Sequence, residues 1–254
     1  MESERKELAD KLIKYIKDCE LELDRDMILK IDGSKDYFLA QALLSLYHYG
    51  IEHTNAVAVC VTNGYATAAR TCMRGLVELT LEIRLMLENG DPRENAVKYL
   101  TYGSLELIKT LKKNDDKSPN IEEIEKNLQE YRKVFPDIVV DLENKFNSKK
   151  GLKHWSGLSY KERLSNIKGA TFSGLDNIYG ILSWDTHSRM AAFTTKFEIT
   201  GQKLNLKTVE EEDITFFERI VDSAGIIFHS LSNAIFYCPI VFEKASGKNL
   251  IRPE

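Results

Sequence analysis

Hydrophobic residues in this chain recur mainly at steps of three and four, the spacing of an amphipathic α-helix. The first such pattern predicts an N-terminal helix over residues 1–30, with one apolar face formed by Leu8, Leu12, Ile16 and Cys19. A second helix is expected from about residue 36 to 61. Its end is predicted at Asn63-Gly64, because both residues tolerate the left-handed conformation found at helix ends.

Three further helices follow from the same pattern. They are expected over residues 65–88, 91–112 and 120–134. Asp91-Pro92-Arg93-Glu94 favours a helix start, because Asp91 can cap free amides and proline suits the first helical position. Ser159-Tyr160-Lys161-Glu162 has the pattern of a second capping box and predicts a short helix there.

Other segments carry different patterns. Pro136 interrupts the preceding helix, and the polar stretch 137–151 predicts a loop. Helices are expected again over 174–192 and 208–239. Between them, apolar residues alternate around Gly201-Gln202, which predicts a small β-hairpin near 194–207.

These elements predict an all-α fold, a single bundle-like domain of about seven or eight helices spanning 1–254. The 254 residues are 43% hydrophobic and 29% charged, a composition typical of a soluble globular protein. The net charge of −4 argues against constitutive nucleic-acid binding.

The sequence also limits the expected cellular location of the protein and the cofactors that it could bind. No segment approaches the ~20 apolar residues that cross a bilayer, and the charged N-terminus lacks a signal-peptide pattern. The four cysteines form no C-x-x-C pair, so neither a zinc site nor a disulfide framework is expected. We therefore expect a cytoplasmic protein with no membrane partner, no metal and no cofactor.

A charged stripe runs along the helix predicted at 65–88. Its members are spaced by four and share one face: Arg70, Arg74, Glu78 and Glu82. On an ordinary helix this would be a solvated face with ion pairs. Here apolar residues surround the stripe almost completely, so a packed polar network is an equal alternative.

Two short stretches hold both tryptophans and two of the five histidines: Lys153-His154-Trp155-Ser156-Gly157 and Ser183-Trp184-Asp185-Thr186-His187. The first precedes a predicted helix start, where free amides favour anions. His187 lies one turn after Ser183, although this spacing alone is not a nucleophile geometry. In either stretch the histidine could equally be a satisfied structural residue.

The remaining histidines and the common motifs add little. His48 and His53 lie five residues apart, on different helix faces, so a shared metal is not expected, and His229 lies in an apolar helix. The chain contains no G-x-G-x-x-G, Walker A, G-x-S-x-G or H-E-x-x-H sequence. The common nucleotide-binding and hydrolase signatures are therefore absent.

Three ordered motifs resemble an uncharacterised bacterial family, domain of unknown function 5677. They are R-x-x-x-R-G-L-V-E-L, H-W-S-G-L-S and Y-x-x-x-S-x-x-x-H, the last formed by Tyr179, Ser183 and His187. The resemblance covers about residues 35–195. It implies an α-helical intracellular protein with no established activity, and its matching positions are Arg74, Glu78, His154, Ser156 and His187.

The architecture also resembles, distantly, the helical ribonucleases of toxin–antitoxin and phage-defence systems. Those enzymes need an arginine four to six residues before a histidine. None of the five histidines has one, and Arg189 follows His187 in the wrong order. The departure argues against RNA cleavage by that mechanism.

Three hypotheses for function follow. The first is a binding or sensing module, in bacterial stress or phage defence, whose buried polar pocket takes a small anionic or nucleotide-like ligand. The pocket residues would be Arg70, Arg74, Glu78, His154, Trp155, Ser156, Ser183 and His187.

The second is a metal-independent hydrolase or ribonuclease in which His154 and His187 act as acid and base and Glu78 orients one of them. It requires the two rings within about 7 Å of each other across the substrate. The third is a structural or protein-interaction domain in which the polar residues only fix the helix packing. All three predict convergence of Arg74, Glu78, His154 and His187.

Overall fold

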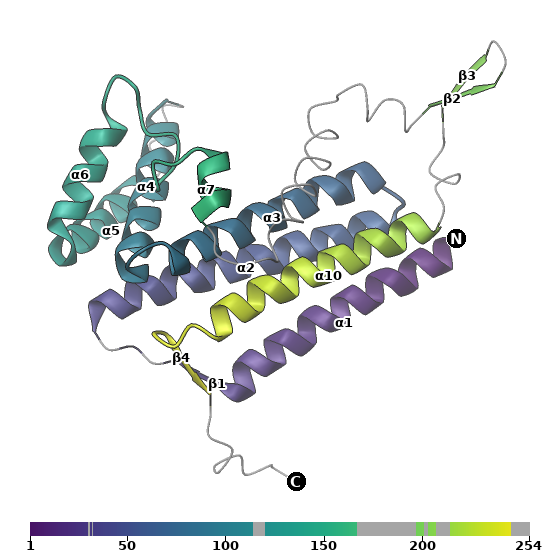
Figure 1. Ribbon diagram of the computed structural model, residues 1–254, viewed down its shortest axis with the longest axis horizontal. Coiled ribbons are helices and arrows are strands. Elements are labelled where there is room, and N and C mark those ends of the chain that lie inside the picture. The colour runs from purple at the N-terminus through teal and green to yellow at the C-terminus, as the bar shows by residue number, and fades with distance from the viewer. Residues whose placement is uncertain are drawn as a thin grey trace, which may run out of the picture.

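The computed structural model describes residues 1–29, 31, 33–113, 120–166, 197–200, 203–206 and 214–244. Within these ranges the chain is all-α in class, as predicted, and eight helices account for most of it (Figure 1). The helices are α1 (Glu2–Asp26), α2 (Ser34–Thr62), α3 (Ala66–Glu88), α4 (Pro92–Lys113), α5 (Asn120–Val134), α6 (Pro136–Phe146), α7 (Tyr160–Asn166) and α10 (Ile214–Phe236). The short strands are β1 (Met27–Leu29), β2 (Phe197–Thr200), β3 (Lys203–Leu206) and β4 (Phe242–Lys244).

Four long helices, α1, α2, α3 and α10, pack side by side and form the body of the molecule (Figure 1). A second group, α4, α5 and α6, packs together at one end of this body and contacts it through α2 and α3. The short helix α7 lies against α3. Asp36 at the start of α2 and Arg93 at the start of α4 form an ion pair of 2.5 Å that links the two groups.

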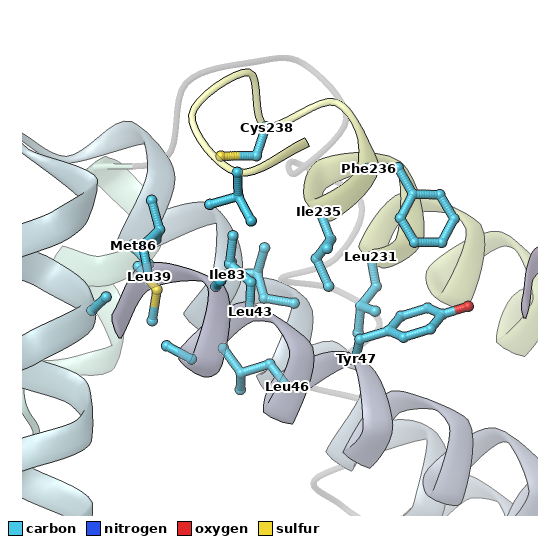
Figure 2. Close-up of a cluster of buried hydrophobic side chains, with 14 of the residues drawn as sticks. Leu39, Leu43, Leu46, Tyr47, Ile83, Met86, Leu231, Ile235, Phe236 and Cys238 are labelled. Carbon is cyan, nitrogen blue, oxygen red and sulfur yellow. The ribbon is translucent and has the colours of Figure 1, made fainter. Parts of the chain in front are cut away.

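The main hydrophobic core lies where α2, α3 and α10 meet. Figure 2 shows side chains from the three helices interdigitating, together with Cys238 from the turn after α10. The Tyr47 ring stacks on Phe228 with their centroids 5.8 Å apart. Burial raises the pKa of the Tyr47 hydroxyl, as expected for a phenol removed from water.

Helix ends follow the predicted signals closely. Helix α2 ends at Thr62, and Gly64 adopts a φ of 72°, a left-handed conformation that glycine takes without strain. The Asp91 carboxylate accepts a hydrogen bond of 2.9 Å from the Arg93 amide at the start of α4. Before α7, the Glu162 carboxylate accepts from the Ser159 amide at 2.8 Å, as a capping box requires.

The predicted loop at 137–151 is wrong over most of its length, because residues 136–146 form helix α6. Pro136 occupies the first turn of this helix, where its missing N–H costs nothing. Val139 and Leu142 are buried on the face that packs against the neighbouring helices. Proline therefore marks a helix start here, not only the end of the previous helix.

Two antiparallel strand pairs complete the described chain. The N-terminal helix ends at Asp26 and not at residue 30, because Met27–Leu29 pair with Phe242–Lys244. Phe197–Thr200 pair with Lys203–Leu206, within the stretch 194–207 where alternating residues predict a hairpin. Among the helices described, none is both long enough and apolar enough to cross a membrane.

Candidate functional site

The carboxylate of Glu82 in α3 is the centre of a polar cluster that joins α3 to the segment after α6. Its side chain is only 14% exposed, because the apolar residues around it on α3 carry this part of the helix into the core. A carboxylate at such a position is costly unless several donors reach it. The segment after α6 supplies those donors.

Three side chains from residues 154–163 donate to Glu82. His154 Nε2 lies 2.9 Å from Oε1 and 3.1 Å from Oε2. Arg163 Nη1 donates to Oε1 at 2.6 Å, and the indole N–H of Trp155 donates to Oε2. Both oxygens are therefore satisfied, and we call Glu82, His154, Trp155 and Arg163 the Glu82 network.

Polar groups contact both nitrogens of the His154 ring. The backbone amide of Ser156 lies 3.2 Å from Nδ1, and the Ser156 hydroxyl lies 2.7 Å from the same nitrogen. Nε2 faces the Glu82 carboxylate and also lies 2.9 Å from Arg163 Nη1. Both ring nitrogens of His154 are engaged within the protein.

The starting position of α7 places Arg163 within reach of Glu82. The Ser159–Glu162 capping box fixes the first turn of this seven-residue helix, and Arg163 follows directly. The guanidinium lies over the Tyr160 ring, 5.5 Å from its centroid. The arginine charge balances the carboxylate of Glu82, so the buried network carries no net charge when His154 is neutral.

Tyr99 of α4 flanks the Glu82 network. Its ring meets the Trp155 ring edge-on, with centroids 6.3 Å apart. Burial, helped by the nearby Glu82 carboxylate and by Tyr49, raises the pKa of the Tyr99 hydroxyl to about 12. Tyr99 thus stays protonated and packs as an uncharged wall beside Trp155.

The raised pKa of Tyr99 predicts an alkaline weakening of the fold. The unfolded chain loses this proton near the ordinary pKa of 10.0, whereas the folded chain keeps it until about 12. Stability is thus fully present below pH 10 and falls as the pH rises from about 10 toward 12. We expect Tyr99→Phe to flatten this part of a stability–pH curve measured by urea unfolding, and a curve unchanged by the substitution would contradict the assignment.

The charged stripe divides into two parts in the structure. Arg74 Nε donates to Glu78 Oε1 at 3.0 Å along the helix, and the Glu78 side chain is 47% exposed. The Arg70 guanidinium lies over the Phe216 ring of α10, 5.0 Å from its centroid. Glu82 reaches the His154 segment, so an acid that meets His154 lies one turn beyond Glu78.

The other predicted site residues lie as follows. Trp155 is buried, only 4% exposed, and belongs to the hydrophobic cluster that also contains residues of α2, α3 and α10. The Ser156 hydroxyl accepts from the Leu158 amide at 3.2 Å in addition to its contact with His154. Ser183 and His187 lie outside the described residues, so their predicted convergence with Arg74, Glu78 and His154 stays a prediction.

Sequence reasoning missed two members of the Glu82 network. Glu82 was recognised only as the last residue of the stripe, although Leu79, Leu81 and Ile83 around it indicate a more buried turn than that of Glu78. Arg163 carried one usable signal, since it directly follows the capping box and shares a short helix with it.

A cavity of about 200 Å³ lies behind the loop of residues 154–157, on the side of α4 and α6. Trp155, Ser156 and Gly157 line one wall. Lys98 of α4, with Asp141 and Lys145 of α6, supplies its charged groups. Lys145 pairs with Asp141 at 2.7 Å, while Lys98 approaches Glu94 only to 3.8 Å. This cavity and the Glu82 network share Trp155.

The described part of the chain does not present a set of side chains arranged to bind a metal ion. No group of three or more histidine, cysteine or acidic side chains there is arranged to hold a metal ion. The Glu82 carboxylate beside His154 accepts from an arginine.

Fold and site together define an all-α protein in which a buried carboxylate of a core helix holds a histidine–tryptophan loop beside a small cavity. The chain belongs to the family of unknown function DUF5677, whose model matches residues 40–203. Comparison with curated proteins and with solved structures gives no match. The matched range includes Glu82, His154, Trp155, Arg163 and Lys98.

Proposed function

We propose that this protein is a binding module whose cavity beside the 154–157 loop takes a small anion. The observation that carries the proposal is the pairing of two lysines, Lys98 and Lys145, with a loop of small polar residues around one cavity. Ammonium groups suit a phosphate, sulfate or carboxylate group.

The size of the cavity favours a small anion over a nucleotide-like ligand. Its volume of about 200 Å³ is below the roughly 300–1,000 Å³ of pockets that hold drug-sized ligands. At about 30 Å³ per molecule it would hold about seven waters, the size of one compact anion with its shell. The nucleotide-like part of the sequence-based hypothesis is therefore the weaker part.

The Glu82 network acts in this proposal as the support of the cavity wall. Trp155 donates its indole N–H to Glu82 on one side and lines the cavity on the other. Both ring nitrogens of His154 contact protein groups: Nδ1 contacts Ser156 and Nε2 contacts Glu82. Neither nitrogen is left for a substrate, which weakens the acid–base role proposed for His154 in a hydrolase.

Anion binding should be visible as a gain in stability. Because a ligand that binds only the folded chain raises its stability, we expect phosphate or sulfate to raise the melting temperature above that in chloride at equal ionic strength. Lys98→Ala and Lys145→Ala should each reduce this gain by at least half. The matched control is Lys133→Ala, a lysine of α5 that is 69% exposed and does not line the cavity.

Trp155 fluorescence gives a second readout of the same site. In a Trp184→Phe background Trp155 is the only tryptophan, so its emission should change on titration with the anion that stabilises the fold. Equal stabilisation by all anions, or a shift that survives both lysine substitutions, would show that the cavity is not an anion site.

A further inference from the structure

A groove on the surface formed by α1 and α10 has a volume of about 670 Å³. Leu8 and Leu12 of α1 and Val221 of α10 line it and are buried. Ile226 of α10 stands at its rim with 70% of its surface exposed, the most exposed large hydrophobic residue of those described. An apolar groove and an apolar projection thus occur on one surface.

Charge is distributed unevenly across this groove. Lys11 lies on the α1 side, and Glu218 and Asp222 lie on the α10 side. Lys11 pairs with Glu7 at 3.3 Å on its own helix, but both side chains are more than 60% exposed, so this pair is weak. The groove therefore offers a positive edge and a negative edge to a partner.

The two helices run in the same direction, from the upper right to the lower left of Figure 1. Leu12 lies against Gly225 and Tyr15 contacts His229, which sets the register of the two helices. In this register Lys11 and Asp222, which both line the groove, lie within one helical turn of the same height. A two-fold axis parallel to the helices would place α1 of one copy over α10 of another at the same height. Lys11 of each copy would then face Asp222 of the other.

We propose that this groove binds the same groove of a second copy of the chain, giving a symmetric dimer. A two-fold interface requires a surface that complements itself. Here Ile226 of one copy meets the groove of the other, and the edge with Lys11 meets the edge with Glu218 and Asp222. Helix α10 has 23 residues, which corresponds to a length of about 35 Å. Two adjacent helices of this length offer an area of the order of the ~800 Å² per partner of a standard interface.

The surface is separate from the proposed anion site and from the family resemblance. Both α1 and α10 lie outside the matched residues 40–203. None of the groove-lining residues belongs to the Glu82 network or to the cavity beside Trp155. A failure of either proposal leaves the other intact.

Sedimentation velocity over a range of concentrations tests the dimer. We expect the wild-type chain to sediment as a dimer and Ile226→Glu to raise the dissociation constant at least tenfold. Val59→Glu is the matched control, since Val59 is also exposed (60%) but lies on α2 outside the groove. Thermal unfolding of each variant confirms that the monomer itself still folds.

Charge reversal shows whether the contact is between copies. Lys11→Glu and Asp222→Lys should each weaken the homodimer, because each places like charges opposite one another. Mixing the two variants should restore dimers, since both charge pairs across the two-fold axis are then attractive. Three results would overturn the proposal: a wild-type chain that remains monomeric, dimers that are insensitive to Ile226→Glu, or charge variants that do not dimerise when mixed. A monomeric wild-type chain would mean that the groove binds a different protein.

Discussion

Replacing Glu82 with glutamine is expected to lower the free energy of unfolding by about 3 kcal/mol, the low end of the cost of breaking a buried ion pair. The glutamine amide brings donors toward Arg163, His154 and Trp155, all of which already donate to this position. Arg163 would keep its charge with no carboxylate to balance it. Urea unfolding followed by circular dichroism measures the loss.

Glu78→Gln is the matched control for this prediction. Glu78 lies one turn earlier on the same helix and pairs with Arg74, but it is 47% exposed, against 14% for Glu82. Its loss should cost no more than about 0.5 kcal/mol, as for other surface ion pairs. Equal losses in the two variants would mean that the Glu82 network does not hold the 154–163 segment.

The double variant Glu82→Gln/Arg163→Gln sharpens the experiment. If the two side chains form one network, the double variant should lose less stability than the sum of the single variants, because the arginine charge left unbalanced by the first substitution is removed by the second. Strict additivity would show that Glu82 and Arg163 contribute independently.

Alanine at Gly75 is expected to destabilise the fold although alanine is the better helix former. A Cβ at Gly75 would clash with Cε1 of His53 and lie 2.6 Å from its Nδ1, so the α2 side chain would have to move. Overpacking of this kind costs about 2 kcal/mol and outweighs a gain of about 1 kcal/mol in helix propensity. The net expected loss is about 1 kcal/mol, measured by urea unfolding.

Gly103→Ala in α4 isolates the propensity effect. Nothing lies within 4 Å of a Cβ at Gly103, so this variant should gain about 1 kcal/mol. Adding His53→Ala to Gly75→Ala should recover much of the loss, because the clashing ring is then gone. A Gly75→Ala protein as stable as the Gly103→Ala protein would refute the close approach of α2 and α3.

The sequence predicts the helices well because each carries both periodicity and end signals. Asn63-Gly64 and the Ser159–Glu162 box mark boundaries that the structure reproduces. Where those signals conflict, prediction fails. Pro136 both ends one helix and starts the next, and the polar surface of α6 conceals a narrow buried face formed by Val139 and Leu142.

The candidate site was predictable in its parts but not in its pairings. Spacing by four places Glu78 and Glu82 near one face of the helix. Each successive residue of the stripe is nevertheless displaced a little further around the helix axis. Only packing decides which acid faces inward, and it selects Glu82. The short strands β1 and β4 could not be predicted either, because their pairing joins residues more than 200 positions apart.

That distant pairing has a consequence for how the chain folds during synthesis. Met27–Leu29 pair with Phe242–Lys244, and the core around Leu43 and Leu46 is covered by α10 as well as α3. The α2–α3 hairpin can form as soon as it leaves the ribosome, but its apolar face stays uncovered until α10 is made. The unit that folds is therefore larger than the 40–203 unit of family resemblance.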